Sequence, residues 1–136
     1  MWISFLVPFL LGAGSAALGV AVQVVIARHK AAEAGHFGLG MILAIYIGAR
    51  LTHSSLSELI LECVFASVML LVSLTSLRLM PKAVGVIIVL HGLYDQLFAH
   101  SAGLPDWYPP FCGGVDVVLG IGVMIFAPKR PTVLTH

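Results

Sequence analysis

The sequence predicts an all-α integral membrane bundle of five transmembrane helices, with the N-terminus outside and the C-terminus inside. Of its 136 residues, 60% are hydrophobic and only 10% are charged, whereas soluble domains carry about 25% charged residues. The apolar residues form long segments, and the Lys and Arg residues between them lie mainly on one predicted side. A chain this apolar could not cover its surface with polar groups in water, but in a bilayer it needs no such cover.

Each predicted helix is an apolar run that ends at charged or helix-breaking residues. The runs cover 3–27, 36–51, 56–77, 83–99 and 111–127, and together they form one domain, 1–136. About 20 helical residues cross the hydrocarbon core, so the first and third runs are ample and the others are short. The first run is expected to stay in the mature protein, because no Lys or Arg precedes it and it is longer than the core of a signal peptide.

The second run, 36–51, is the shortest, and charge decides whether it crosses. Lys and Arg accumulate on the cytoplasmic side of membrane proteins. If this run crosses, one side collects every basic residue except Arg50, namely Arg28, Lys30, Arg78, Lys82, Lys129 and Arg130. If it is re-entrant, four helices cross and the basic residues divide between the two sides. Five crossings therefore fit better, and four crossings remain the alternative.

Turns and loops connect the runs. Ser55 or Ser57 is suited to cap the third helix, because a hydroxyl can accept a free backbone N–H of the first turn. The longest loop, 101–110, contains Trp107 and Tyr108, which are typical of a membrane–water interface or could form a lid over a site. Small residues predict close packing of the first and fifth helices, above all Gly12, Gly19, Gly113, Gly114, Gly120 and Gly122.

Three acidic residues lie inside predicted helices at a similar depth. Glu62, Asp95 and Asp116 are each about five or six residues from an outer helix end, roughly 7 to 9 Å below the surface. Polar residues spaced four apart share a helix face, and this spacing relates Glu58 to Glu62, His91 to Asp95, Cys112 to Asp116 and Tyr46 to Arg50. Such pairs are costly against lipid and should face inward. The sequence therefore predicts one outward-facing intramembrane site centred on Glu62, His91, Asp95 and Asp116.

Three functions fit such a site. In the first, these four residues hold a divalent metal ion such as zinc, iron or manganese, in a centre that binds the ion or acts on a lipid-like substrate. In the second, the site is a proton relay or part of a proton-coupled transporter of a small solute. His36 is then the one candidate on the inner half, and so small a transporter would need a homo-oligomer. In the third, the polar network only fixes helix packing. HExxH, G-x-S-x-G and P-loop signatures are absent from the sequence.

Neighbouring polar residues are predicted to support this site. Arg50 would be the counter-ion of the acids, Tyr46 and Tyr94 would donate hydrogen bonds, and Glu58 and Cys112 would lie just behind the centre. Both cysteines lie in apolar runs and are expected to be buried thiols. The net charge of +1 argues against nucleic acid as a partner, so the expected partner is the lipid bilayer.

The C-terminal third carries a pattern of its own. His91-Gly92-Leu93-Tyr94-Asp95 is followed by Pro105-Asp106-Trp107-Tyr108-Pro109-Pro110-Phe111-Cys112 and then by Asp116. This HG-aromatic-D element with a later WYPP-x-C and Asp resembles a family of small bacterial integral membrane proteins that carries only a domain-of-unknown-function label. The segment 35–48 is similar too. The resemblance implies a multi-pass protein of the bacterial cytoplasmic membrane, and it implies no activity.

Overall fold

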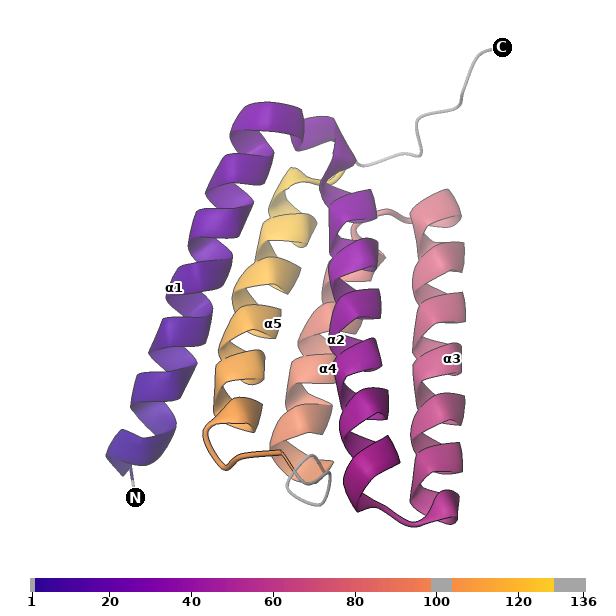
Figure 1. The fold of residues 1–136 in the computed structure, drawn as a ribbon. Helices are drawn as coiled ribbons and strands as arrows, with labels where there is room; N and C mark the ends of the chain where they lie inside the picture. Colours follow the sequence, from indigo (N-terminus) through magenta and orange to yellow (C-terminus); the bar gives the residue numbers. More distant parts are fainter. Residues whose placement is uncertain (1, 99–103, 129–136) are drawn as a thin grey trace.

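The computed structural model describes residues 2–98 and 104–128, which are helical apart from short turns. The elements are α1 (Trp2–Ala27), the 3-10 helix η1 (Arg28–Lys30), α2 (Ala31–His53), α3 (Leu56–Leu79), α4 (Ala83–Phe98) and α5 (Tyr108–Phe126). No strand occurs in these residues. Successive α-helices run in alternating directions along the bundle (Figure 1). The prediction of an all-α fold is thus confirmed.

The first two α-helices are separated by a reversal of the chain. α1, η1 and α2 form one uninterrupted helical stretch of 52 residues, Trp2–His53. The stretch folds back because Ala27 leaves the helical conformation, with φ −155° and ψ 60°. α1 and α2 therefore run in opposite directions on either side of η1 (Figure 1).

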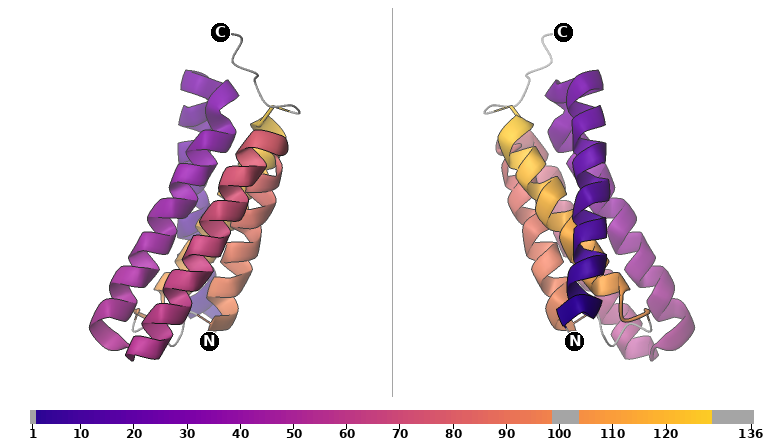
Figure 2. Two further views of the ribbon diagram at one scale, coloured as in Figure 1. Left: turned by 90° about the vertical axis from the view of Figure 1, so that its right-hand side faces the viewer. Right: turned by 90° about the vertical axis from the view of Figure 1, so that its left-hand side faces the viewer.

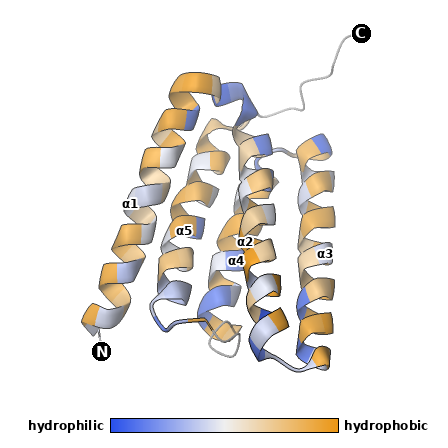
Figure 3. Ribbon diagram, in the orientation of Figure 1, coloured by the Kyte–Doolittle hydropathy of each residue, from blue (hydrophilic) through white to orange (hydrophobic). Residues whose placement is uncertain are grey.

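The outside of the bundle is apolar. Within the described part of the chain, three helical stretches are long and apolar enough to cross a membrane, namely Trp2–His53, Leu56–Leu79 and Tyr108–Phe126, and α4 is a shorter apolar helix. Leu11, Leu61 and Leu97 are 63%, 68% and 62% exposed. Most residues along the helices are hydrophobic, and hydrophilic residues mark η1 (Figure 3). So much exposed apolar surface indicates a membrane protein.

α5 is the central element of the packing. It packs along α1 on one side and along α4 on the other, whereas α3 packs against α2 and α4; Figures 1 and 2 show α5 between α1 and α4. A methyl group at Gly12 would collide with the backbone of Phe111, and one at Gly120 with the carbonyl oxygen of Gly85. Close packing is therefore present at Gly12 and Gly120, as predicted, whereas nothing lies within 4 Å of a methyl placed at Gly19.

Two helices begin three or more residues earlier than predicted. α2 begins at Ala31 rather than at residue 36, so it has 23 residues and is about 34 Å long. α5 begins at Tyr108 rather than at residue 111, with Pro109 and Pro110 in its first turn, where a proline removes no helical hydrogen bond. The end of the predicted 101–110 loop is therefore helix. Residues 99–103, where the fourth helix was predicted to end, lie outside the described residues.

The start of α3 follows the capping prediction. The Ser55 side chain accepts a hydrogen bond from the backbone N–H of Glu58, and the Glu58 carboxylate accepts one from the backbone N–H of Ser55 at 2.8 Å. This reciprocal pair is a capping box, which satisfies two otherwise free donors. Ser55 is therefore the cap.

Basic residues gather at one end of the bundle. η1, the α3–α4 turn and the last turn of α5 lie at the same end, and the α2–α3 turn lies at the other (Figure 1). The first end carries Arg28, Lys30, Arg78 and Lys82, and the other carries Arg50. Lys129 and Arg130 lie outside the described residues.

Candidate metal centre

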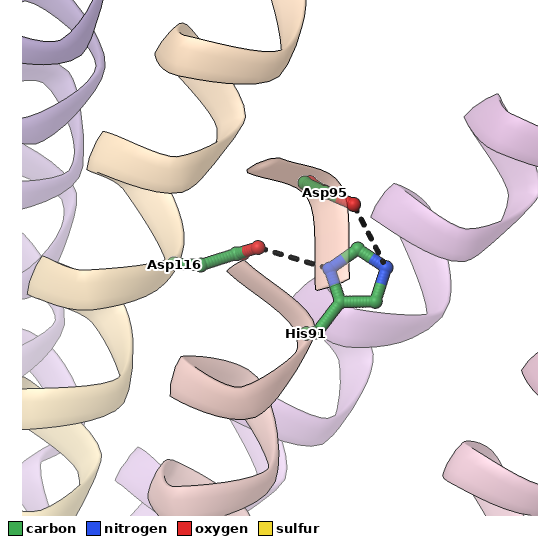
Figure 4. A group of neighbouring side chains, drawn as sticks. All are labelled: His91, Asp95 and Asp116. Carbon is green, nitrogen blue, oxygen red and sulfur yellow. Dashed lines mark hydrogen bonds and ion pairs between the residues drawn. The ribbon is translucent and has the colours of Figure 1, made fainter. Parts of the chain in front are cut away.

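The candidate site lies inside the bundle between α4 and α5. His91 and Asp95 are four residues apart on α4 and share a face, and Asp116 points toward His91 from α5 (Figure 4). All three residues are 0% exposed. Asp116 follows the first residue of α5 by eight positions (108 to 116), about 12 Å along the axis and therefore deeper than predicted.

The imidazole of His91 lies between the two carboxylates. Its Nδ1 is 2.9 Å from Asp116 Oδ2, and its Nε2 is 3.6 Å from Asp95 Oδ1. The first distance is that of a hydrogen bond, whereas the second is too long for one. Each ring nitrogen thus faces an acidic oxygen, but only Nδ1 is bonded to it.

Gly92 allows Asp116 to approach this closely. A Cβ at position 92 would lie 2.8 Å from the Cβ of Asp116 and 3.4 Å from its Oδ2. Carbon atoms in contact are normally about 3.5–4.0 Å apart, so a side chain here would push α5 and its carboxylate away from His91. The sequence shows Gly92 beside His91, but its role depends on the contact between α4 and α5.

Several polar atoms of the group have no hydrogen-bond partner among the described residues. They are His91 Nε2, both side-chain oxygens of Asp95, and Asp116 Oδ1. Buried polar atoms are normally paired, because an unpaired one costs about 1–3 kcal/mol. One ligand atom from each of the three residues lies within 4.8 Å of the others. A cation between His91 Nε2 and Asp95 would therefore give those atoms a partner.

Aromatic rings surround the imidazole. The ring centroids of Tyr46, Phe65 and Tyr94 lie 5.8, 6.3 and 6.2 Å from that of His91. The hydroxyl of Tyr46 lies near Asp95, but it has no hydrogen-bond partner within the described ranges. Phe65, which the sequence did not single out, stacks on Tyr94 with centroids 4.0 Å apart.

Glu62 belongs to a second polar group beside the first. Arg50 Nε donates to Glu62 Oε2 at 3.3 Å, and the Tyr94 hydroxyl donates to the same oxygen at 3.3 Å. Arg50 is 6% exposed and Glu62 is 3% exposed, so the pair is shielded from solvent. Three of the four predicted central residues thus come together, and Glu62 contacts the predicted counter-ion instead.

The other predicted supporting residues lie outside the group of His91, Asp95 and Asp116. Glu58 is exposed and forms the capping box with Ser55. Cys112 is buried in an apolar cluster with Tyr46, and Cys63 is half-buried. Both thiols are free. None of these side chains is part of the His91, Asp95 and Asp116 group.

The fold and the site together define a class, a helical membrane-type bundle with a buried histidine held between two aspartates. Comparisons with protein-family models, with curated proteins and with solved structures find no match to this chain. The resemblance of the C-terminal third to a bacterial membrane family therefore stays a prediction.

Proposed function

We propose that this protein is a multi-pass protein of the bacterial cytoplasmic membrane that binds a divalent transition-metal ion inside its bundle. His91 Nε2 and Asp95 bind the ion directly, and Asp116 holds the imidazole in place. The observation that carries the proposal is the convergence of three fully buried side chains whose remaining polar atoms lack partners among the described residues. Imidazole nitrogen and carboxylate oxygen are common ligands of zinc, iron and manganese in proteins.

The distances suit this arrangement. Two tetrahedral ligands that are each about 2.1 Å from an ion lie about 3.4 Å apart, and His91 Nε2 and Asp95 Oδ1 are 3.6 Å apart. On the other side of the ring, Nδ1–H donates to Asp116 Oδ2 at 2.9 Å. A carboxylate that accepts the second N–H of a metal-bound histidine fixes its tautomer and orientation. The Tyr46 hydroxyl near Asp95 is a further oxygen close to this position.

Charge also favours a divalent ion. With a neutral imidazole, Asp95 and Asp116 carry two negative charges in the interior, where an uncompensated charge is strongly destabilised. The Arg50–Glu62 pair next to them balances itself. One divalent cation would therefore make the buried group neutral.

The topology that we propose has five crossings, with the N-terminus outside. The end that carries Arg28, Lys30, Arg78 and Lys82 is then cytoplasmic, and the α2–α3 turn is outside. The described part of α4, Ala83–Phe98, has 16 residues, about 24 Å of helix. This part is short for the hydrocarbon core, but α3 and α5 flank it. In this orientation Asp95 lies on the outer side of His91.

The geometry supports binding of an ion more directly than catalysis. His91, Asp95 and Asp116 are 0% exposed, so a lipid-like substrate could not reach an ion there unless the helices separated. Metal binding requires no such opening once the ion is in place. We therefore propose metal binding as the function and attach no reaction to it.

A proton relay is the second candidate, and one observation favours it. Both ring nitrogens of His91 face carboxylate oxygens, so an imidazolium would be stabilised from both sides. Toward the proposed cytoplasmic end, His36 Nδ1 and Ser73 Oγ form a hydrogen bond of 2.8 Å between α2 and α3, which places a polar pair on that half. In this case the group holds protons in place of a metal ion.

Elemental analysis of the purified protein separates the two candidates. We expect about one zinc, iron or manganese ion per native chain and a loss of that ion in His91→Ala. His29→Ala is the matched control, because His29 is exposed in η1, and it should keep the ion. A native protein without metal after exposure to each of the three ions would exclude the metal function and leave the relay.

A further inference from the structure

An open pocket of about 310 Å³ lies beside the buried group, between α2, α3 and α4. Its lining includes the charged residues Arg50, Glu58 and Glu62, together with the aromatic residues Phe65, Tyr94 and Phe98. The pocket is at the end of the bundle where the α2–α3 turn lies, because Arg50 is in the last turn of α2 and Glu58 is in the first turn of α3. It is therefore on the proposed outer side.

The charges of this pocket favour a cation. Glu58 and Glu62 contribute two carboxylates against the single guanidinium of Arg50, so the lining has a net negative charge. Arg50 and Tyr94 both bond to Oε2 of Glu62. The other oxygen, Oε1, is buried and has no hydrogen-bond partner among residues 2–98 and 104–128. A cation that reaches the Glu62 carboxylate from the pocket would supply that partner.

Two aromatic rings lie next to both the pocket and His91. Phe65 and Tyr94 both line the pocket, and their ring centroids lie 6.3 and 6.2 Å from that of His91. They stack on each other with centroids 4.0 Å apart. The hydroxyl of Tyr94 is bonded to Glu62, so the position of this ring is tied to the carboxylate that would receive a cation.

We propose that the pocket is an outer cation site and the entrance to the buried centre, an inference that rests on the proposed metal function. A divalent cation first binds Glu62, with Glu58 adding to the attraction. On binding, it competes with the Tyr94 hydroxyl for Glu62 and releases that ring. The cation then passes between Phe65 and Tyr94 to His91 and Asp95. The Phe65–Tyr94 stack therefore controls the rate of loading, and the buried ligands control the affinity.

The test measures rate and affinity separately, with Co²⁺ as the probe and the full chain in detergent. Stopped-flow absorbance gives the loading rate, transfer to excess chelator gives the release rate, and equilibrium titration gives Kd. We expect Tyr94→Ala and Phe65→Leu each to speed loading and release by about fivefold, because each removes half of an aromatic stack. Kd should stay within about twofold, since both rates change together.

Charge in the pocket is tested with a matched pair of variants. Glu58→Gln keeps the length and polarity of the side chain and should slow loading about threefold at low salt, because one attracting charge is lost. Glu33→Gln makes the same change in the first turn of α2, at the opposite end of the bundle, and should load like the native chain. The difference between the two should shrink as salt is added.

The outcomes keep this inference distinct from the metal function. If the native chain binds no Co²⁺, the metal function fails and the entrance fails with it. If Co²⁺ binds but the loading rate is unchanged in both aromatic variants, the ion enters elsewhere and only the entrance is refuted. If Glu33→Gln slows loading as much as Glu58→Gln, the pocket has no special attraction for the ion, and the outer site is refuted.

Discussion

Replacing Gly92 with alanine tests how α4 and α5 hold the buried group. The added methyl would lie 2.8 Å from the Cβ of Asp116, about 0.7–1.2 Å closer than carbon atoms normally pack. If α5 moves away by about 1 Å, the distance from His91 Nδ1 to Asp116 Oδ2, now 2.9 Å, exceeds the hydrogen-bond range. His91 then loses the carboxylate that orients it. We expect the affinity for zinc to fall by about 10–100-fold.

The assay is a competitive zinc titration against a chromophoric chelator, in the same detergent for every variant. Gly48→Ala is the matched control, because a methyl group at Gly48 would have nothing within 4 Å. Both substitutions raise helix propensity by the same amount, so the difference between them isolates the contact with Asp116. We expect Gly48→Ala to bind zinc like the native chain.

Two results would refute this reasoning. Native zinc affinity in Gly92→Ala would show that Asp116 does not need its present distance from His91. An equal loss in Gly48→Ala would show that the affinity responds to a general change in the helices. The melting temperature of each variant without metal measures the cost of overpacking separately. Overpacking alone should lower the free energy of unfolding of Gly92→Ala by about 1–3 kcal/mol.

Three further predictions concern the second polar group, the cap of α3 and the topology. Arg50→Met should lower the free energy of unfolding by about 3 kcal/mol, because it leaves the buried Glu62 carboxylate without its charge partner. Unfolding in mixed micelles measures this free energy, and an unchanged value would contradict a charged pair. Ser55→Ala should cost about 1 kcal/mol in the same assay through loss of the cap, and Ser57→Ala, its control, should cost less. With both native cysteines replaced, an impermeant maleimide should label His53→Cys in intact cells but label His29→Cys only after lysis; the reverse pattern would invert the topology.

The sequence predicted which residues share a face, because that follows from helical spacing alone. His91 and Asp95 are four apart, and the structure places the imidazole of His91 between the carboxylates of Asp95 and Asp116. Apolar runs likewise located the helices. The runs do not fix the helix ends, because Pro109 and Pro110 are typical of a loop and yet are also accepted in the first turn of a helix.

The neighbours of each helix could not be predicted in the same way. The predicted depths of Glu62 and Asp116 in the membrane are similar, which predicts that the two residues share one site. Depth orders residues along the bundle axis but says nothing about their position around it. α3 packs against α2 and α4, whereas α5 packs between α1 and α4, so Glu62 meets Arg50 and Asp116 meets His91. The sequence also gives no sign that Phe65 lies beside His91, because a phenylalanine in an apolar helix is usually a packing residue.

The buried group can be neutral in two ways, and one changes into the other when a divalent cation replaces two protons. With a neutral imidazole, the two aspartates carry two negative charges, which either one divalent cation or two protons would cancel. In the protonated form, an imidazolium lies between one carboxylate and one neutral carboxyl group. Metal binding would then release about two protons for each ion. A metal ion and two protons are therefore alternative occupants of one arrangement. Both need the position of His91 between Asp95 and Asp116 that Gly92 permits.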